Sequence, residues 1–417
     1  MTNEHSIDER ARAILSQNDI GSYTVPTHGL YPYQWNWDSA FAAMGFAQYN
    51  LDRAWTELET LFSGQWDDGM VPHILFHKDD EGYFPGPDVW KGRGPIPSSG
   101  ISQPPVAATM ARRIFEKNPD LGRARMAALY DCAVSWHRWF MDWRLDRGAV
   151  CITHPWESGR DNAPDWDTGM SAIDPVDVGT YTRRDTSHVN SEMRPTKFDY
   201  DRYVWLVQQG ARQGWQQSAM LPETPFRVAD PTMTFILLRA NRDLTELGRE
   251  LGRDTSELEA WTRALEAGVE TLWNDKHGHY DSRNVLTGEW SNSLTSASFL
   301  CWYAGVDRPE MRDALRDVLS QVEFGIPSLD RRDARFDAQR YWRGPVWGVI
   351  NMLAGLGMSE MGLPEGEKLR ESTAKLISEH GFAEYFDPRD GAPAGGQSFT
   401  WTAAVWLGWA SPTAEAV

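Results

Sequence analysis

Two kinds of helical segment follow one another along this chain, and their difference constrains the fold more than any other feature. The segment at 255–274 is amphipathic, with charged residues on one face and Leu258, Trp261, Leu265 and Leu272 on the other. The segments TSASFLCWYAG (295–305) and GPVWGVINMLA (344–354) carry almost no charge, as expected of helices that are buried on all sides. An outer amphipathic ring around an inner apolar ring is the pattern of an (α/α)6 barrel.

Helical periodicity extends over most of the chain, so we expect an all-α protein. Start signals support several of these helices, for example the N-cap Asp230 followed by Pro231 at the first helical position. No period of 20 to 50 residues repeats, which argues against a uniform solenoid. We expect one (α/α)6 barrel domain over residues 1–417. The predicted helices cover residues 8–16, 39–49, 51–63, 105–116, 121–143, 202–214, 231–251, 255–274, 295–305, 309–321, 344–361, 364–381 and 400–409.

Two long stretches break this helical rhythm. Residues 64–100 are rich in Gly and Pro, and residues 166–195 are polar and irregular. Loops of this length usually form lids or binding walls, so we expect both insertions to fold over the mouth of the barrel. A disordered linker is the alternative, but Tyr83, Phe84, Trp90 and Tyr181 favour docking onto the barrel.

Charge and composition narrow the range of partners. The formal net charge is −18 and is spread along the chain, which disfavours binding to nucleic acid and to anionic membranes. The polar N-terminal residues have no apolar core typical of a secretion signal, and no run of about 18 apolar residues predicts a membrane span. We therefore expect a cytoplasmic protein. Three cysteines without metal-ligand spacing predict neither a disulfide framework nor a metal site, and a homo-oligomer stays open.

Aromatic residues point to a class of ligand. The chain has 21 Trp, and several of them stand beside Gly, Pro, Asp and Arg in the loop-like segments YPYQWNWD, HPWESGRDNAPDWD and RYWRGPVWG. Many tryptophans must pack in the core. Aromatic faces next to polar groups nevertheless suit the C–H faces and hydroxyls of a sugar, so we expect a carbohydrate ligand.

The densest set of carboxylates lies in HPWESGRDNAPDWD at 154–167. A solvated acidic loop would not need its two tryptophans, and the spacing of a calcium loop is absent. A Trp-walled site would raise the pKa of a carboxylic acid, as acid catalysis requires.

A second candidate segment is FAEYFDPRDGAPAGGQSFTW at 382–401. Its paired glycines permit close backbone approach, but the Lys of a phosphate-binding loop is missing. Glu384 has an aromatic context that suits a general base. Hydrolysis of an acetal needs two carboxyl groups about the anomeric carbon, and the pattern alone does not choose them among 59 acidic residues.

These segments resemble the motifs of glycoside hydrolase family 63. ESGRD (157–161) with its trailing PDWD is similar to the acid-bearing motif, and EYFDPRDGAPAGGQSFTW (384–401) is similar to the base-bearing motif. WNWDSAF (35–41), DDGMVPH (67–73), SQPP (102–105) and YWRGPVW (341–347) also look like family elements, in the expected order. The resemblance covers about residues 31–409 and is closest to the mannosylglycerate and glucosylglycerate hydrolases.

The resemblance implies an (α/α)6 barrel and an exo-acting α-glycosidase that inverts configuration. Asp161 would be the general acid and Glu384 the general base, with their carboxyl groups ~6.5–9.5 Å apart. The residues expected around the departing hexose are Trp35, Trp37, Asp38, Trp342, Arg343, Gly344 and Trp347. The residues expected around glycerate are Tyr31, Trp35, Tyr83, Gln103, Arg194 and Tyr341.

An anionic aglycone requires a cation, and Arg183, Arg184 and Arg194 lie in the second insertion. Ordinary surface positions for these arginines would instead fit an α-glucosidase acting on a neutral disaccharide such as kojibiose or nigerose. A trehalase fits the ESGRDNAPDWD segment less well. A non-catalytic sugar-binding protein on the same barrel would have no need for both carboxylates. The expected partner is thus a small glycoside, and no sequence feature demands a cofactor or a metal.

Overall fold

A computed structural model describes residues 6–80 and 82–414, except for the side chains of Ser187 and His188. Within these residues, six mostly buried segments form a closed inner ring, in which each contacts the next and the last contacts the first. They are α2 (Asn36–Phe46), α5 (Ala107–Lys117), α11 (Pro231–Glu250), the 3₁₀ turn η4 (Ser298–Cys301), α14 (Gly348–Glu360) and α16 (Thr400–Val405). The prediction of an (α/α)6 barrel is confirmed.

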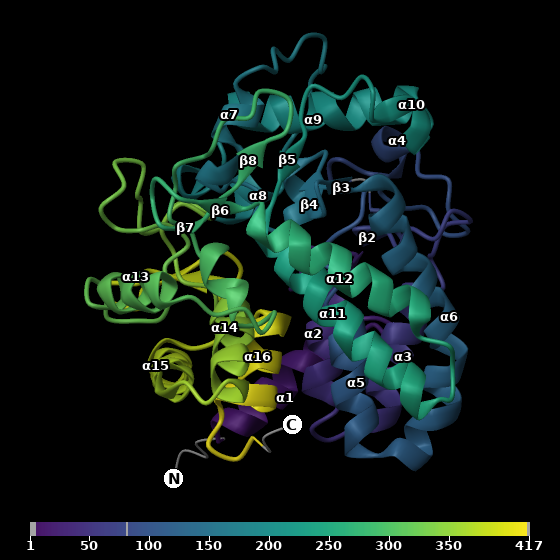
Figure 1. Cartoon of the computed structure of the whole chain (residues 1–417), viewed down its shortest axis with the longest axis vertical. Coiled ribbons are helices and arrows are strands. Elements are labelled where there is room, and N and C mark those ends of the chain that lie inside the picture. Colours follow the sequence, from purple (N-terminus) through teal and green to yellow (C-terminus); the bar gives the residue numbers. More distant parts are fainter. Residues whose placement is uncertain (1–5, 81, 415–417) are drawn as a thin grey trace.

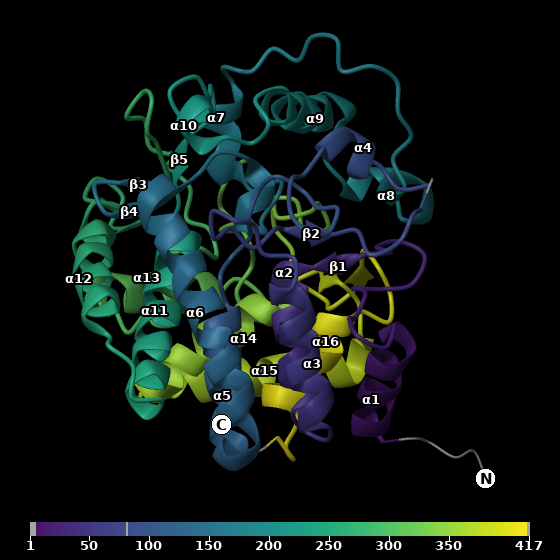
Figure 2. The same cartoon turned by 90° about the vertical axis from the view of Figure 1, so that its right-hand side faces the viewer.

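Each inner segment packs against an outer helix, as Figures 1 and 2 show. In the order of their inner partners, these are α3 (Leu51–Phe62), α6 (Pro119–Trp143), α12 (Ser256–Glu270), α13 (Pro309–Leu319), α15 (Pro364–His380) and α1 (Ile7–Asn18). The first helix therefore closes the barrel against the last inner helix. Every residue of α2 is buried, whereas α12 buries one face through residues such as Leu258 and Leu265. The two predicted kinds of helix thus occupy the two rings.

Local signals explain where most of these helices begin. The Asp230 side chain accepts hydrogen bonds from the amides of Thr232 and Met233, which caps α11 at the predicted residue. Helix α9 (Lys197–Arg212) begins earlier than the predicted residue 202 because the Thr196 side chain caps it by accepting from the amide of Asp199. A capping box of Ser6 and Glu9 starts α1.

The predicted α-helix at 295–305 is wrong, because only the 3₁₀ turn η4 forms there. Long-range pairing explains the difference: Thr295 bridges Leu329, and the amide of Ser296 donates to the carbonyl of Ser328. The first residues of the segment are therefore held in an extended arrangement, and Gly305 at φ 68° ends it. The predicted helix at 400–409 also changes character, since its last part is a π-helical turn, η5 (Trp406–Ala410).

Ten short strands form four small sheets within the described residues, and the longest strand has four residues. Two antiparallel pairs, β1–β2 and β9–β10, lie next to the site described below. The strands are β1 (Gln34–Trp35), β2 (Ile74–Leu75), β3 (Leu145–Asp146), β4 (Ala149–Ile152), β5 (Val228–Ala229), β6 (Trp273–Asn274), β7 (His279–Tyr280), β8 (Arg283–Asn284), β9 (Tyr385–Phe386) and β10 (Pro393–Ala394).

The two long insertions meet at the end of the barrel that lies opposite the chain termini in Figures 1 and 2. The rings of Phe84 and Tyr181 stack with their centroids 4.4 Å apart, and the Tyr200 hydroxyl donates to the carbonyl of Phe84. Short helical segments in and around the insertions are α4 (Pro87–Trp90), η1 (Pro155–Ser158), η2 (Pro164–Trp166), α7 (Asp167–Met170), α8 (Asp185–His188), η3 (Ser191–Met193) and α10 (Gln217–Met220). The docking covers this end of the barrel.

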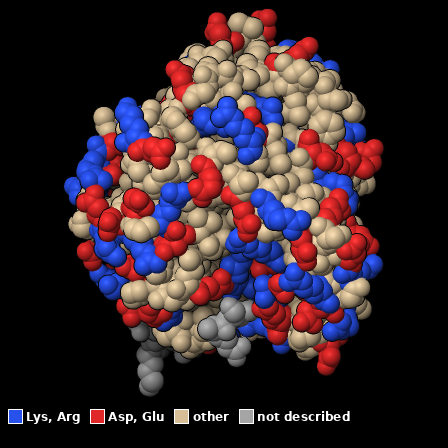
Figure 3. Space-filling view, viewed as in Figure 1, with Lys and Arg blue, Asp and Glu red and all other residues tan. Residues whose placement is uncertain are grey.

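The surface carries charges of both signs. Figure 3 shows acidic and basic side chains interspersed over one face of the molecule. Among the described residues, no helix has the length and apolar character needed to cross a membrane.

Candidate active site

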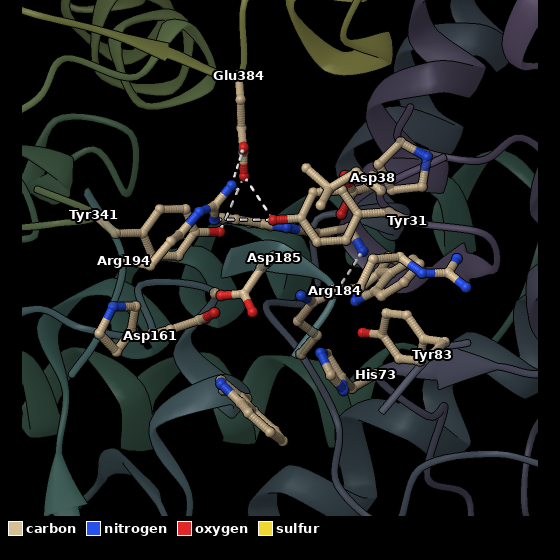
Figure 4. Close-up of a pocket in the computed structure, with 18 of the residues that line it drawn as sticks. Tyr31, Asp38, His73, Tyr83, Asp161, Arg184, Asp185, Arg194, Tyr341 and Glu384 are labelled. Carbon is tan, nitrogen blue, oxygen red and sulfur yellow. Dashed lines mark hydrogen bonds and ion pairs between the residues drawn. The ribbon is translucent and has the colours of Figure 1, made fainter. Parts of the chain in front are cut away.

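A cavity opens where the two insertions meet the barrel. It encloses about 820 Å³, its opening to solvent included, which is enough for a ligand of disaccharide size. Figure 4 shows the side chains of Asp161 and Glu384 reaching into it from different sides. Besides this pair, the predicted residues that line the cavity are Tyr31, Trp35, Trp37, Asp38, Tyr83, Gln103, Arg194 and Tyr341.

A buried ion cluster holds the segment that carries Asp161. The Arg160 guanidinium lies 3.0 Å from both Asp165 and Asp230, so it ties this segment to the start of α11. Gly159 has a φ of 69°, and a Cβ there would stand 2.7 Å from the ring of Trp37. Glycine is therefore required directly before the arginine, and the turn places Asp161 at the cavity wall.

The environment of Asp161 favours its protonated form. Burial raises the pKa of Asp161 from 3.8 to about 7, the negative charge of Glu384 adds to the rise, and Arg194 opposes it. The side chain keeps contact with the cavity although protein surrounds it. A carboxylic acid of this kind can donate a proton near neutral pH.

Glu384 is held by four donors. Its Oε1 accepts hydrogen bonds from the hydroxyls of Tyr31 (3.0 Å) and Tyr341 (3.2 Å). Its Oε2 accepts from Arg194 Nη2 and from the amide of Gly396, both at 2.8 Å. The side chains of Glu384 and Arg194 are only 1% and 2% exposed, so the carboxylate and the guanidinium form a buried ion pair.

The paired glycines of the segment at 382–401 allow a backbone amide to reach the Glu384 carboxylate. Gly395 has a φ of 70°, and a Cβ there would lie 2.3 Å from Glu384 Oε2. The backbone amide of Glu384 donates to the carbonyl of Gly396 at 2.8 Å, which fixes the two segments side by side. Only glycine at position 395 lets the following amide approach the carboxylate.

Aromatic rings form much of the remaining wall. Trp35 packs edge-on against Tyr31 and Tyr83, with ring centroids 5.3 and 5.7 Å away. Beside them, Asp38 is buried, and burial first and Glu384 second raise its pKa well above 3.8. The Gln103 side chain accepts a hydrogen bond from the amide of Trp37 at 3.1 Å. Rings beside polar groups suit a sugar.

The other predicted site residues lie behind the cavity wall. Trp342 and Trp347 stack at 3.8 Å with their rings nearly parallel, and both are fully buried. Arg343 forms an ion pair with Asp167 at 2.6 Å. A Cβ at Gly344 would lie 2.2 Å from a backbone oxygen, which explains the glycine there by packing. These four support the site without lining it.

The arginines of the second insertion have different positions. Arg194 and Arg184 line the cavity, and Arg184 forms an ion pair with Asp80 of the first insertion. Arg183 does not line it, because its guanidinium pairs with Asp185 at 2.6 Å and donates to the carbonyl of Pro195.

Several lining residues escaped the sequence reasoning. Asp185 reaches the cavity from α8, and no sequence pattern marks it out within its irregular loop. Trp156 lies directly before the ESGRD segment, so its place in that motif could have predicted that it lines the cavity. The remaining lining residues that were not predicted are Pro26, Leu30, His73, Phe84, Gly159, Pro195, Tyr200, Tyr203, Phe399 and Trp401.

The two histidines of the motif segments are uncharged near neutral pH. Burial lowers the pKa of His154 to about 3 and that of His73 well below 6.5. His154 makes two hydrogen bonds with backbone atoms, of Trp156 and Tyr203. Among the described residues, no group of three or more His, Cys, Asp or Glu side chains has an arrangement suited to a metal ion.

Comparison with known proteins agrees with the motifs. Residues 31–402 match the family described as the mannosylglycerate hydrolase MGH1-like glycoside hydrolase domain. The chain is 42% identical to mannosylglycerate hydrolase MGH1 of Selaginella moellendorffii, over 96% of this chain and 85% of the relative. It is 33% identical to the glucosylglycerate hydrolase of Mycolicibacterium hassiacum, over 96% of each chain.

A solved structure confirms the fold. The crystal structure of the family 63 mannosylglycerate hydrolase from Thermus thermophilus, in complex with Tris and D-glycerate, is similar with a TM-score of 0.92 and 42% identity. The match covers 96% of this chain and 98% of that one. The predicted membership of family 63, close to the mannosylglycerate and glucosylglycerate hydrolases, is therefore confirmed. This chain is a glycoside hydrolase and belongs to the MGH1-like family.

Proposed function

We propose that this enzyme hydrolyses the α-glycosidic bond of mannosylglycerate, with Asp161 as general acid and Glu384 as general base. One observation carries the assignment: a partly buried carboxyl group whose pKa is raised to about 7 shares a sugar-sized cavity with a buried carboxylate. Asp161 suits the acid because a pKa of about 7 keeps a large fraction of it protonated near neutral pH, which leaves Glu384 for the base.

The proposed reaction has one chemical step. Asp161 gives its proton to the glycosidic oxygen while the bond from that oxygen to the anomeric carbon breaks. Glu384 takes a proton from a water molecule, whose oxygen attacks the anomeric carbon from the opposite face. The products are glycerate and mannose of inverted configuration. Proton exchange with solvent then returns Asp161 to its protonated form and Glu384 to its carboxylate form.

The aromatic wall and Arg194 account for the two parts of the substrate. We assign the hexose to Trp35, Trp37, Asp38 and Gln103, with Trp342, Arg343, Gly344 and Trp347 supporting this wall from behind. We assign glycerate to Tyr31, Tyr83, Arg194 and Tyr341. A guanidinium in the cavity matches an anionic aglycone, and the relatives named above act on glycerate conjugates by their names.

A substrate panel tests the assignment. The purified enzyme is incubated with mannosylglycerate, glucosylglycerate, kojibiose and nigerose, and the released hexose is measured. We expect the highest kcat/KM on mannosylglycerate. Preference for a neutral disaccharide would reject the anionic aglycone but keep the carboxylate pair, whereas binding without any release would reject catalysis.

A further inference from the structure

The carboxylate of Glu384 has no acceptor site left for water. An ionised carboxylate offers about four lone-pair sites, and described residues donate four hydrogen bonds to this one. A general base has to accept a hydrogen bond from the water that it deprotonates. One of the four donors must therefore leave before Glu384 can act.

The four donors differ in how readily an incoming anion could draw them away from Glu384. The amide of Gly396 belongs to the backbone and is fixed by the reverse hydrogen bond from Glu384. The hydroxyls of Tyr31 and Tyr341 are neutral, so an anion attracts them less than it attracts Arg194, whose guanidinium is charged.

One N–H group of the Arg194 guanidinium has no acceptor among the described residues. Nη2 donates to Glu384 and Nη1 to the hydroxyl of Tyr31 at 3.0 Å, but the buried Nε donates to no described residue. Nε and Nη2 together form an edge that binds a carboxylate through two parallel hydrogen bonds. A ligand carboxylate on this edge would accept hydrogen bonds from Nε and from the second N–H of Nη2, and its negative charge would compete with Glu384 for the guanidinium.

We propose that the anionic aglycone draws Arg194 away from Glu384 and so frees the lone pair that accepts the proton of the attacking water. Arg194 then acts as a positioning residue that keeps the base occupied until an anion binds. The inference rests on the proposed function, because it takes Glu384 as the base. It explains why a cation assigned to the aglycone contacts the proposed base.

The test supplies the sugar and the carboxylate of the substrate as two separate compounds. α-Mannosyl fluoride provides a mannosyl group with a neutral leaving atom, and acetate provides a carboxylate small enough to enter beside it. In the reaction the bond from carbon to fluorine breaks, water supplies the new oxygen, and hydrogen fluoride leaves. We expect acetate to raise the rate of the wild type about tenfold, the factor expected for one lost charge-assisted hydrogen bond, and acetamide to leave it unchanged.

Variants of Arg194 complete the test. Arg194→Gln, which has no cation to occupy the base, should hydrolyse the fluoride without acetate about tenfold faster than the wild type does. It should not respond to acetate, and it should lose most activity on mannosylglycerate. Arg194→Lys keeps the charge without the two-donor edge and should respond weakly. Arg316→Gln, an exposed position on α13, should behave like the wild type.

Three outcomes are decisive against this account. A wild type that does not respond to acetate, or an Arg194→Gln variant that is slowed on the fluoride as strongly as on mannosylglycerate, would overturn the release of the base. Absence of mannosylglycerate hydrolysis in the wild type would overturn the proposed function and this inference with it.

Discussion

Asp161 and Glu384 are buried in one cavity but have different neighbours. Described residues donate four hydrogen bonds to Glu384, one of them from the cation Arg194 and one from a fixed amide. Asp161 has protein around it and a second carboxylate nearby, and its pKa is raised to about 7. The different surroundings support the proposed roles of acid and base.

Neutralising either carboxyl group should abolish most activity. We expect Asp161→Asn and Glu384→Gln each to lower kcat by ~10²–10⁴-fold, the usual contribution of general acid–base catalysis. Steady-state kinetics on mannosylglycerate measure the loss, and circular dichroism checks the fold. Glu371→Gln, an exposed residue of α15, is the matched control. Turnover close to that of the wild type would remove the altered residue from its role.

The pKa of Asp161 predicts the alkaline limb of the pH profile. The general acid must be protonated, and its pKa in the free enzyme is raised from 3.8 to about 7. We therefore expect kcat/KM to fall as the pH rises through about 7, because ionised Asp161 cannot donate a proton. A profile of kcat/KM between about pH 5 and 9 shows this limb. Constant activity up to the alkaline end of that range would contradict the assignment.

At the scale of elements, close packing between the inner segments sets the shape of the barrel. A Cβ at Gly357 of α14 would lie 2.3 Å from backbone atoms of Trp302 and Tyr303, directly after η4. Backbone atoms cannot move aside as a flexible side chain can, so glycine is required for this contact. The contact compensates for the shortness of η4 by bringing α14 near.

Gly357→Ala should therefore destabilise the barrel. We expect a loss of about 1–3 kcal/mol in the free energy of unfolding, as is typical of overpacking in a core. Urea denaturation measures it. Gly348→Ala on the same helix is the control, because its Cβ would meet only a methyl group at 3.8 Å. Equal stability of the two variants would show that α14 shifts without cost.

The same elements show what the sequence could predict. Period and caps located α11 and α14 to within a few residues, because those signals are local. The 3₁₀ turn η4 could not be predicted, since its short length follows from pairing with residues 328 and 329. Motif segments proposed the catalytic pair, but Trp342 and Trp347 turned out to stack behind the wall, where sequence alone cannot distinguish lining from support.

At the scale of the whole molecule, the closed ring supplies a rigid base and the two insertions supply the wall. Tyr83 comes from the first insertion and Arg194 from the second, while Asp38 belongs to α2. Parts far apart in the sequence thus meet at one end of the barrel (Figure 2). Composition indicated that both insertions dock, but not that Asp185 would reach the cavity, because that depends on how the insertions contact each other.

The most direct test of the account is the configuration of the first sugar released. Hydrolysis of mannosylglycerate is followed by proton NMR within the first minutes, before the anomers of mannose equilibrate. The account predicts that β-mannose appears first, since Glu384 activates a water on the face opposite the leaving glycerate. Initial release of α-mannose would mean retention of configuration, and it would contradict the roles of acid and base given to Asp161 and Glu384.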